Sequence, residues 1–186
     1  MAGPYRDLLV EELEGNRNAI EDTVREQTEI PGNILEHLRS REGSVSESYL
    51  DSLGKLTGGV GHLMSPEEQE LYPEGTFIPE DVRQNWLSAD SRTAFDAANE
   101  QMSELGIDNP QLRDSLVGVN FQMGTGWRNK FKGVWEGMQG GDWESAAGNV
   151  QWVDPTTKAQ ESLWHEQTPV RTGDFMEALR GMQQPI

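Results

Sequence analysis

Residues 44–66 read SVSESYLDSLGKLTGGVGHLMSP and differ in character from the sequence on either side of them. Val45, Tyr49 and Leu50 supply β-forming and apolar side chains, and four glycines then follow within residues 54–61. Glycine at this density suits tight turns between short strands, because it adopts positive φ without a steric penalty. We therefore predict a small sheet over residues 44–64.

The sequence on both sides of this sheet is typical of helices. Asn33 is a suitable cap for a helix that runs to about residue 41, and Ser65 followed by Pro66 and two glutamates marks another start. Further helices are predicted over residues 79–102, 111–123, 127–138, 142–150 and 168–183, with a loop at 72–76. One small sheet among many helices predicts a mainly helical α+β fold.

Composition limits the chemistry that the chain can perform. Its 186 residues are enough for one domain to bury its own core. It has no cysteine, which excludes disulfides, thiolate metal sites and a cysteine nucleophile. The three histidines lack the spacing of zinc ligands, so no metal and no cofactor is predicted. A formal charge of −17 argues against a nucleic-acid partner, since phosphate binding calls for clustered Lys and Arg.

Residues 1–32 form a polar segment with eight acidic residues and three arginines. We interpret it as an N-terminal extension to a domain over residues 33–186. It suits either a solvated appendage or a docking segment for a partner. The first residues do not resemble a signal peptide, and no stretch has the length and apolarity of a membrane span. We thus expect a protein made in the cytoplasm that has no membrane partner.

Glu42, Asp51 and Thr57 are the candidates for catalysis. Glu42 ends the first predicted helix, and the other two lie in the predicted sheet. A helix end that faces a hairpin could bring two carboxyls within several ångströms, which is the arrangement that glycoside hydrolysis needs. One carboxyl would be protonated to donate to the leaving oxygen, and the other ionised. Spacing alone does not separate this pair from a surface pair in a chain with 32 acidic residues.

Several blocks of the chain resemble the lysozymes of T-even bacteriophages, in order and with similar spacing over residues 33 to about 182. The blocks are NILEHLRSREG (33–43), YLD (49–51), TGGVGHL (57–63), NFQMG (120–124), WESAAGN (143–149) and SLWHEQTPVR (162–171). The resemblance implies a two-lobed fold, in which a long helix joins a small β-containing lobe to a helical lobe. It also implies a muramidase that hydrolyses the β-1,4 bond between N-acetylmuramic acid and N-acetylglucosamine in bacterial peptidoglycan.

In this family the position of Glu42 holds the general acid, and those of Asp51 and Thr57 position the attacking water. The family is associated with inversion at the anomeric carbon. Five residues fall where the family lines its cleft, namely Gly61, Leu63, Phe121, Gln122 and Asn149. Structural roles remain open for most of them: Phe121 and Leu63 suit a core, and Gly61 suits a turn. For Gln122 a functional role is favoured over a structural one, because a polar residue in an apolar helix needs hydrogen-bond partners.

The resemblance also implies ion pairs that support the site. His62 matches a histidine that pairs with an acid, here Asp90, and we expect the two within ion-pair reach, about 4 Å. Arg171 matches an arginine that faces the catalytic glutamate, Glu42. Asp174 and Arg41 reverse the signs of a second family pair, so we predict that they also meet.

The chain departs from the family in three ways. Residues 33–186 carry 24 acidic residues against 12 Lys and Arg, whereas familiar members are basic. The polar extension is additional, and the stretch between His62 and Ile78 is shorter than in the T-even enzymes. Repulsion from an anionic wall would matter little in high salt, or if a virion carried the enzyme to the wall. A virion or tail protein is accordingly a possible partner of residues 1–32.

Two other functions fit the same residues. A lytic transglycosylase would use the sugar's own hydroxyl in place of water, and retention of Asp51 and Thr57 favours hydrolysis over it. A virion module could also keep the fold and lose activity. As a lysozyme, the protein would reach the host wall in the periplasm either through holin release or by delivery with the virion.

The reversed pair gives a test. Exchanging Arg41 and Asp174 (R41D with D174R) should destabilise the protein less than either change alone, because the exchange restores opposite charges. Chemical denaturation of the three variants measures the coupling. Simple additivity of the two single effects would reject the pair.

Overall fold

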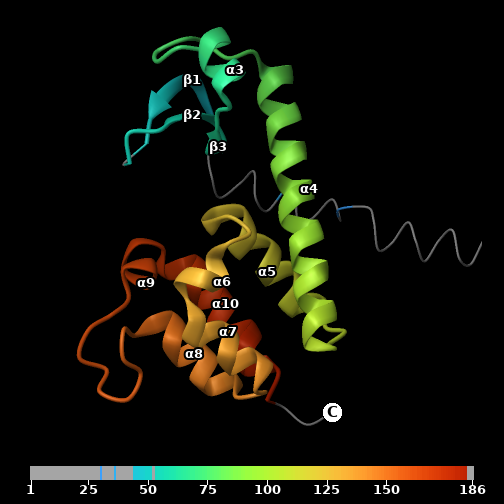
Figure 1. Cartoon of the computed structure of the whole chain (residues 1–186), viewed down its shortest axis with the longest axis vertical. Coiled ribbons are helices and arrows are strands. Elements are labelled where there is room, and N and C mark those ends of the chain that lie inside the picture. The colour runs from blue at the N-terminus through green and yellow to red at the C-terminus, as the bar shows by residue number, and fades with distance from the viewer. Residues whose placement is uncertain (1–29, 31–35, 37–43, 52, 184–186) are drawn as a thin grey trace, which may run out of the picture. The chain divides into compact units, whose positions relative to one another are not determined.

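A computed structural model describes residues 30, 36, 44–51 and 53–183 of the chain. The chain divides into two units, Met1–Gly32 and Asn33–Ile186. All the helices and strands labelled in Figure 1 belong to the second unit. It contains helices and one three-stranded antiparallel sheet, which confirms the predicted mainly helical α+β class.

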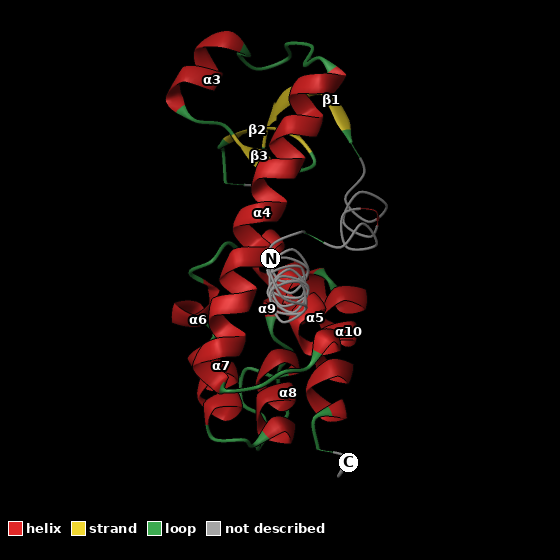
Figure 2. Ribbon diagram, turned by 90° about the vertical axis from the view of Figure 1, so that its right-hand side faces the viewer, coloured by secondary structure: helices red, strands yellow, loops and turns green. Residues whose placement is uncertain are grey.

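The sheet consists of β1 (Val45–Leu50), β2 (Leu56–Gly59) and β3 (His62–Leu63), in that order (Figure 2). Both neighbouring pairs are antiparallel, and Thr57 in the central strand pairs with Tyr49 on one side and Leu63 on the other. The turn after β1 and the turn before β3 contain Gly54 and Gly61 at φ 74° and 83°. The predicted sheet over residues 44–64 is therefore confirmed, and glycine stands where the turns need positive φ.

One face of this sheet packs on a small core of Met64, Ile78 and Trp86, with Leu56, Tyr72 and Val82 against it. Gly58 lies where β2 comes closest to this core. A Cβ atom there would lie 2.5 Å from Cδ1 of Ile78 and 2.7 Å from Cε of Met64. The core can come this near to the strand only because residue 58 has no side chain.

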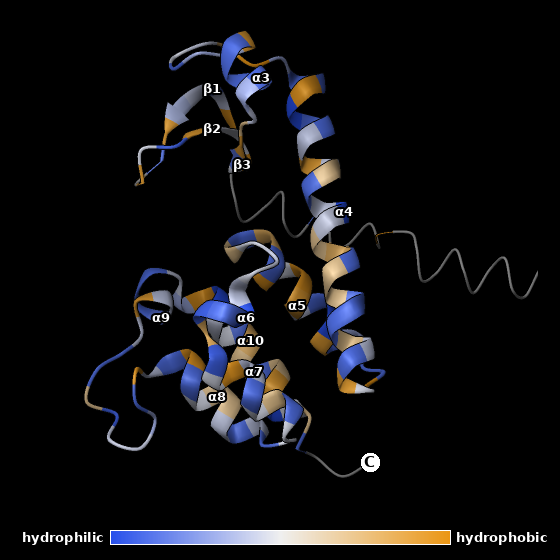
Figure 3. Cartoon of the chain, in the orientation of Figure 1, coloured by the Kyte–Doolittle hydropathy of each residue, from blue (hydrophilic) through white to orange (hydrophobic). Residues whose placement is uncertain are grey.

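Helix α3 (Pro66–Leu71) begins as predicted. The Ser65 side chain accepts from the N–H of Glu68, and the Glu68 carboxylate accepts from the N–H of Ser65, which completes a capping box. The long helix α4 (Glu80–Leu105) contacts β2 and β3 near its start and α5 (Pro110–Met123) further on. Its buried residues recur every three or four positions, which gives the hydrophobic bands along α4 in Figure 3.

The remaining helices are α6 (Trp127–Lys130), α7 (Lys132–Gln139), α8 (Trp143–Gln151), α9 (Leu163–Gln167) and α10 (Pro169–Gly181). Of these, α6 and α10 pack on α5, and α7, α8 and α9 pack on those two. Trp127 is fully buried and makes edge-on contacts with Trp135 and Phe175. Aromatic side chains thus supply much of this core, as expected for a chain with few aliphatic residues.

The sequence prediction for these helices was wrong at one place and incomplete at another. The single helix predicted over 127–138 is interrupted at Phe131, which has φ −115° and ψ 56° and packs its ring on Trp164. A short helix over 163–167 was not predicted; the Ser162 side chain caps it. It ends at Thr168, because the residue before a proline disfavours helical geometry.

No helix within the described part of the chain combines the length and apolarity needed to cross a membrane.

The close approach at Gly58 gives a prediction. Replacing Gly58 by alanine should lower the free energy of unfolding by about 1 to 3 kcal/mol, because Ile78 and Met64 must move away from the new methyl group. Thermal or urea unfolding measures the loss. Gly118→Ala is the matched control, since that helical glycine has no atom within 4 Å of its ideal Cβ position. It should stabilise by up to about 1 kcal/mol. Equal effects of the two changes would contradict the packing described.

Candidate active site on the hairpin

Asp51 is held by the turn that follows β1. One of its carboxylate oxygens accepts hydrogen bonds from the N–H groups of Leu53 and Lys55, each at 2.8 Å. Its own N–H donates to the carbonyl of Lys55 at 2.9 Å. Such side-chain bonds to nearby backbone are how aspartate stabilises tight turns. The turn therefore fixes the carboxyl position independently of any substrate.

Thr57 lies beside this turn in the central strand. Directly paired residues of antiparallel strands project from the same face, so Tyr49, Thr57 and Leu63 share the face opposite Gly58. Asp51 lies just beyond the end of β1, and its N–H and the Thr57 hydroxyl both donate to the carbonyl of Lys55, which places the two residues beside one another. We call Tyr49, Thr57 and Leu63, with the adjacent Asp51, the outer face of the sheet. The fold brings together three predicted site residues there: Asp51, Thr57 and Leu63.

The outer face combines polar groups with an exposed apolar side chain. Thr57 is only 4% exposed, and its hydroxyl donates to the carbonyl of Lys55 at 3.1 Å. The hydroxyl oxygen keeps its capacity to accept, so it can also hold a water. Leu63 is 54% exposed, which excludes the core role left open for it. An exposed leucine beside a held carboxylate and a hydroxyl is suited to a sugar, which has apolar and polar faces.

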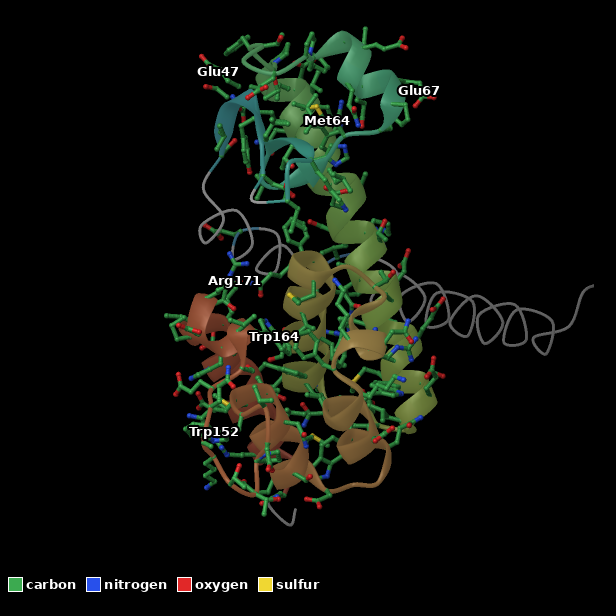
Figure 4. The ribbon with its side chains drawn as sticks, turned by 60° about the vertical axis from the view of Figure 1, so that its left-hand side comes forward. Glu47, Met64, Glu67, Trp152, Trp164 and Arg171 are labelled. Atoms are coloured by element: carbon green, nitrogen blue, oxygen red, sulfur yellow. The ribbon has the colours of Figure 1, made fainter. Side chains whose placement is uncertain are left out.

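Glu42 and Arg41 lie outside the described residues. The separation of the Glu42 and Asp51 carboxyls therefore stays a prediction, as do the pairs of Glu42 with Arg171 and of Arg41 with Asp174. Arg171 is half-buried in the first turn of α10, and Asp174 follows on the same helix (Figure 4).

The predicted contact between His62 and Asp90 is confirmed. Nδ1 of His62 lies 2.8 Å from a carboxylate oxygen of Asp90 on α4, and the imidazole stacks on Trp86 with ring centroids 4.5 Å apart. A second acid was not predicted: Nε2 lies 3.0 Å from the Glu68 oxygen that also caps α3. The Ser65-to-Glu68 capping box in the sequence was the signal that could have located it. His62 thus connects β3 to both α3 and α4.

These contacts shift the pKa values of both partners. Burial is the largest single effect on His62 and lowers its pKa, but hydrogen bonds and attraction from Asp90 and Glu68 together outweigh it, so the pKa is raised. For Glu68, burial is the largest single effect and raises the pKa. Hydrogen bonds from Ser65 and His62, together with attraction to His62, outweigh it, so the pKa of Glu68 is lowered. The pair is therefore charged over a wider pH range than the isolated groups.

The remaining predicted cleft residues lie mostly in the helical part. Phe121 and Gln122 are half-buried in the last turn of α5, and the Gln122 carbonyl accepts from the indole N–H of Trp164 at 3.5 Å, a long hydrogen bond. Asn149 donates to the carbonyl of Ser145 at 2.8 Å and packs on Gly133. Gly61 has a positive φ, so turn geometry accounts for a glycine at that position. A role for these residues in binding stays a prediction.

A polar pair inside the helical core had not been predicted. The amides of Gln101 on α4 and Asn120 on α5 exchange two hydrogen bonds of 2.9 Å, and both residues are almost fully buried. Since each satisfies the other, the pair holds the two helices in register and needs no ligand. Among the described residues, no group of three His, Asp or Glu side chains gathers as a metal site requires.

The contacts of His62 predict a dependence of stability on pH. Because the pKa of His62 is raised in the folded protein, its contacts stabilise the fold fully at pH values below 6.5, the ordinary pKa of histidine. This contribution is lost as the pH rises through the pKa of His62 in the folded protein. A lowered pKa on Glu68 contributes above its ordinary 4.5 and is lost as pH falls through the folded pKa. The network should therefore stabilise most between these two values.

We expect His62→Gln to lower the free energy of unfolding by about 1 to 3 kcal/mol near pH 5.5, and by less near pH 9. Urea unfolding at both pH values measures this. Glu68→Gln should also reduce the pH dependence, whereas Glu67→Gln, at the exposed neighbouring residue, should leave it unchanged (Figure 4). Parallel pH curves for the native protein and His62→Gln would show that the network does not titrate as described.

A comparison with known proteins finds similarity to one phage protein. The chain is 25% identical over 147 residues to the peptidoglycan hydrolase gp36 of Pseudomonas phage phiKMV. The match covers 79% of this chain but only 15% of the relative's length. No family model matches the chain. The chain is thus similar, at low identity, to a segment of a phage protein named for breaking down peptidoglycan.

Proposed function

We propose that residues 33–186 form a phage-type muramidase that hydrolyses the β-1,4 bond between N-acetylmuramic acid and N-acetylglucosamine in peptidoglycan. The observation that supports the proposal lies at the outer face of the sheet, where the turn holds the Asp51 carboxylate and the Thr57 hydroxyl donates to the same Lys55 carbonyl as the Asp51 N–H. The similarity to a phage peptidoglycan hydrolase supports the same substrate class.

In the proposed mechanism, Glu42 is the general acid and protonates the leaving glycosidic oxygen. The Asp51 carboxylate accepts a proton from a water on the opposite side of the sugar ring, and the Thr57 hydroxyl holds that water in line. The attack inverts the anomeric carbon, which requires carboxyls far enough apart to admit the water, about 6.5 to 9.5 Å. No metal or cofactor takes part.

The surrounding residues have supporting roles in this proposal. Arg171 pairs with the Glu42 carboxylate. His62 and Asp90 hold β3 on α4, and β3 in turn pairs with the strand that carries Thr57. The glycan strand contacts Gly61, Leu63, Phe121, Gln122 and Asn149.

A lytic transglycosylase is the closest alternative in chemistry. It uses the sugar's own hydroxyl in place of water, so the capacity of the buried Thr57 hydroxyl to accept a hydrogen bond from a water would go unused. That hydroxyl favours hydrolysis. We further propose that the protein reaches the wall through holin release or as a virion component, with residues 1–32 as the docking segment in the second case.

Mass spectrometry of fragments released from purified peptidoglycan tests the proposal. The native protein should release muropeptides with reducing ends, and Glu42→Gln should slow release by about 100-fold or more, because a general acid contributes that much to the rate. Glu47→Gln is the matched control. It makes the same chemical change at an exposed glutamate of β1 and should keep native activity (Figure 4).

Each alternative predicts a different product. Anhydro ends would assign a lytic transglycosylase. Absence of any fragment from folded protein, at low salt and at about seawater ionic strength, would contradict the proposed activity and favour a non-catalytic virion module. Faster release at the higher salt would show that screening relieves repulsion between an acidic protein and an anionic wall.

A further inference from the structure

The corner between α9 and α10 connects two residues of the proposed site. Only Thr168 separates the two helices, with φ −137° and ψ 57°. α9 carries Trp164, whose indole N–H donates to the side chain of Gln122, and the first turn of α10 carries Arg171. Figure 4 shows Arg171 at the end of α10 that is nearer to the sheet. The geometry of this corner therefore determines where the two site residues lie relative to one another.

The start of α10 has no side-chain cap. The Thr168 side chain makes no hydrogen bond to the first N–H groups of α10, and its hydroxyl donates instead to the Trp164 carbonyl at 2.9 Å. Pro169 follows and has no N–H group to be capped. A cap normally fixes a helix start, because the first N–H groups lack partners within the helix. The direction in which α10 leaves the corner therefore depends on other contacts.

Thr172 supplies a polar contact across the corner. It is fully buried, and its hydroxyl donates to the carbonyls of Thr168 and Pro169, at 2.9 and 3.3 Å. The same hydroxyl oxygen lies 2.7 Å from Nδ1 of His165 on α9. A hydroxyl has one proton, and a carbonyl can only accept, so the contact with His165 is a donation from Nδ1–H to the hydroxyl oxygen. The arrangement thus determines that Nδ1 of His165 carries a proton.

Aromatic packing holds the other side of the same corner. The centroid of the Trp164 ring lies 4.6 Å from that of Phe131 and 6.0 Å from that of Phe175 on α10. Apolar packing holds two helices together but is not directional, whereas a hydrogen bond weakens steeply when it is bent. The bond from His165 to Thr172 is therefore the contact best suited to fix the angle of the first turn of α10.

We propose that His165 is a positioning residue for the muramidase reaction. It donates through Nδ1 to Thr172 and so fixes the first turn of α10, from which Arg171 pairs with the Glu42 carboxylate. This inference rests on the proposed function, which assigns Glu42 as the general acid. A general acid must stay aligned with the leaving oxygen, and a displacement of about 1 Å can cost about 100-fold in rate. His165 and Thr172 act through Arg171 and do not touch the sugar.

Paired substitutions at the two residues separate positioning from packing. Thr172→Val removes the hydroxyl and keeps the shape of the side chain, whereas Thr172→Ser keeps the hydroxyl. His165→Asn places an amide N–H where Nδ1 stands, whereas His165→Gln places its amide nitrogen nearer to the position of Nε2. Thr172→Val and His165→Gln each remove the bond, and Thr172→Ser and His165→Asn each retain it.

Steady-state cleavage of soluble, uncross-linked glycan strands by the full chain measures the effect. Thr172→Val and His165→Gln should lower kcat by about tenfold and change KM by less than about twofold, because the misplaced group acts on the general acid and not on substrate binding. Thr172→Ser and His165→Asn should retain kcat within about twofold. Thr172→Val combined with His165→Gln should lower kcat no further than either change alone, since both remove the same bond.

Thr93→Val is the matched control. The Thr93 hydroxyl also donates to a carbonyl one helical turn earlier, that of Ala89, at an exposed position of α4. This change should leave kcat unchanged. All rates are measured at a temperature where circular dichroism shows each variant to be folded, so that a loss of stability alone does not lower kcat.

The outcomes separate this inference from the proposed function. A native protein that releases no fragments would contradict the muramidase, and with it any positioning role in that reaction. A native protein that cleaves, together with a folded Thr172→Val of native kcat, would overturn the positioning role alone and leave the bond a structural one. A rise in KM in place of the fall in kcat, or losses that multiply in the double variant, would likewise overturn it.

Discussion

The position of His62 between two carboxylates is the constraint on which the candidate site depends. The imidazole contacts Asp90 on α4 and Glu68 on α3, and it stacks on Trp86 at the core. β3 has only two residues, too few to hold a strand in place by backbone hydrogen bonds alone. Its side-chain contacts therefore determine where β3 lies. Because β3 pairs with β2, they also determine which way the outer face of Thr57 and Leu63 is presented.

The sequence predicted some parts of this fold and not others. The sheet, the start of α3 and the contact of His62 with Asp90 were predictable, since glycine density, capping residues and a family resemblance each carry a local signal. The break at Phe131 was not, because it arises where the ring packs on Trp164, far away in sequence. The helix over 163–167 was missed for a related reason: its five residues are too few to show a periodic pattern.

The candidate site likewise contains residues that the sequence predicted and residues that it did not. Asp51 and Thr57 were predicted as catalytic residues from the resemblance, and their shared contact with the Lys55 carbonyl places them beside one another. Glu68 was missed, although its capping box is visible in the sequence, because one carboxylate oxygen serves both the cap and His62.

The tight turn after β1 determines the geometry of the hairpin. It holds the Asp51 carboxylate through the N–H groups of Leu53 and Lys55, and the Lys55 carbonyl accepts from the Thr57 hydroxyl.

In the proposed mechanism, the outer face positions a water for attack opposite the leaving group. Proton NMR of the anomeric signals, recorded in the first moments of peptidoglycan cleavage, tests this most directly. New reducing ends in the α configuration are predicted, because attack from the opposite side inverts the β-linked carbon. New ends that appear in the β configuration would contradict the account, since they would require a covalent intermediate in place of a positioned water.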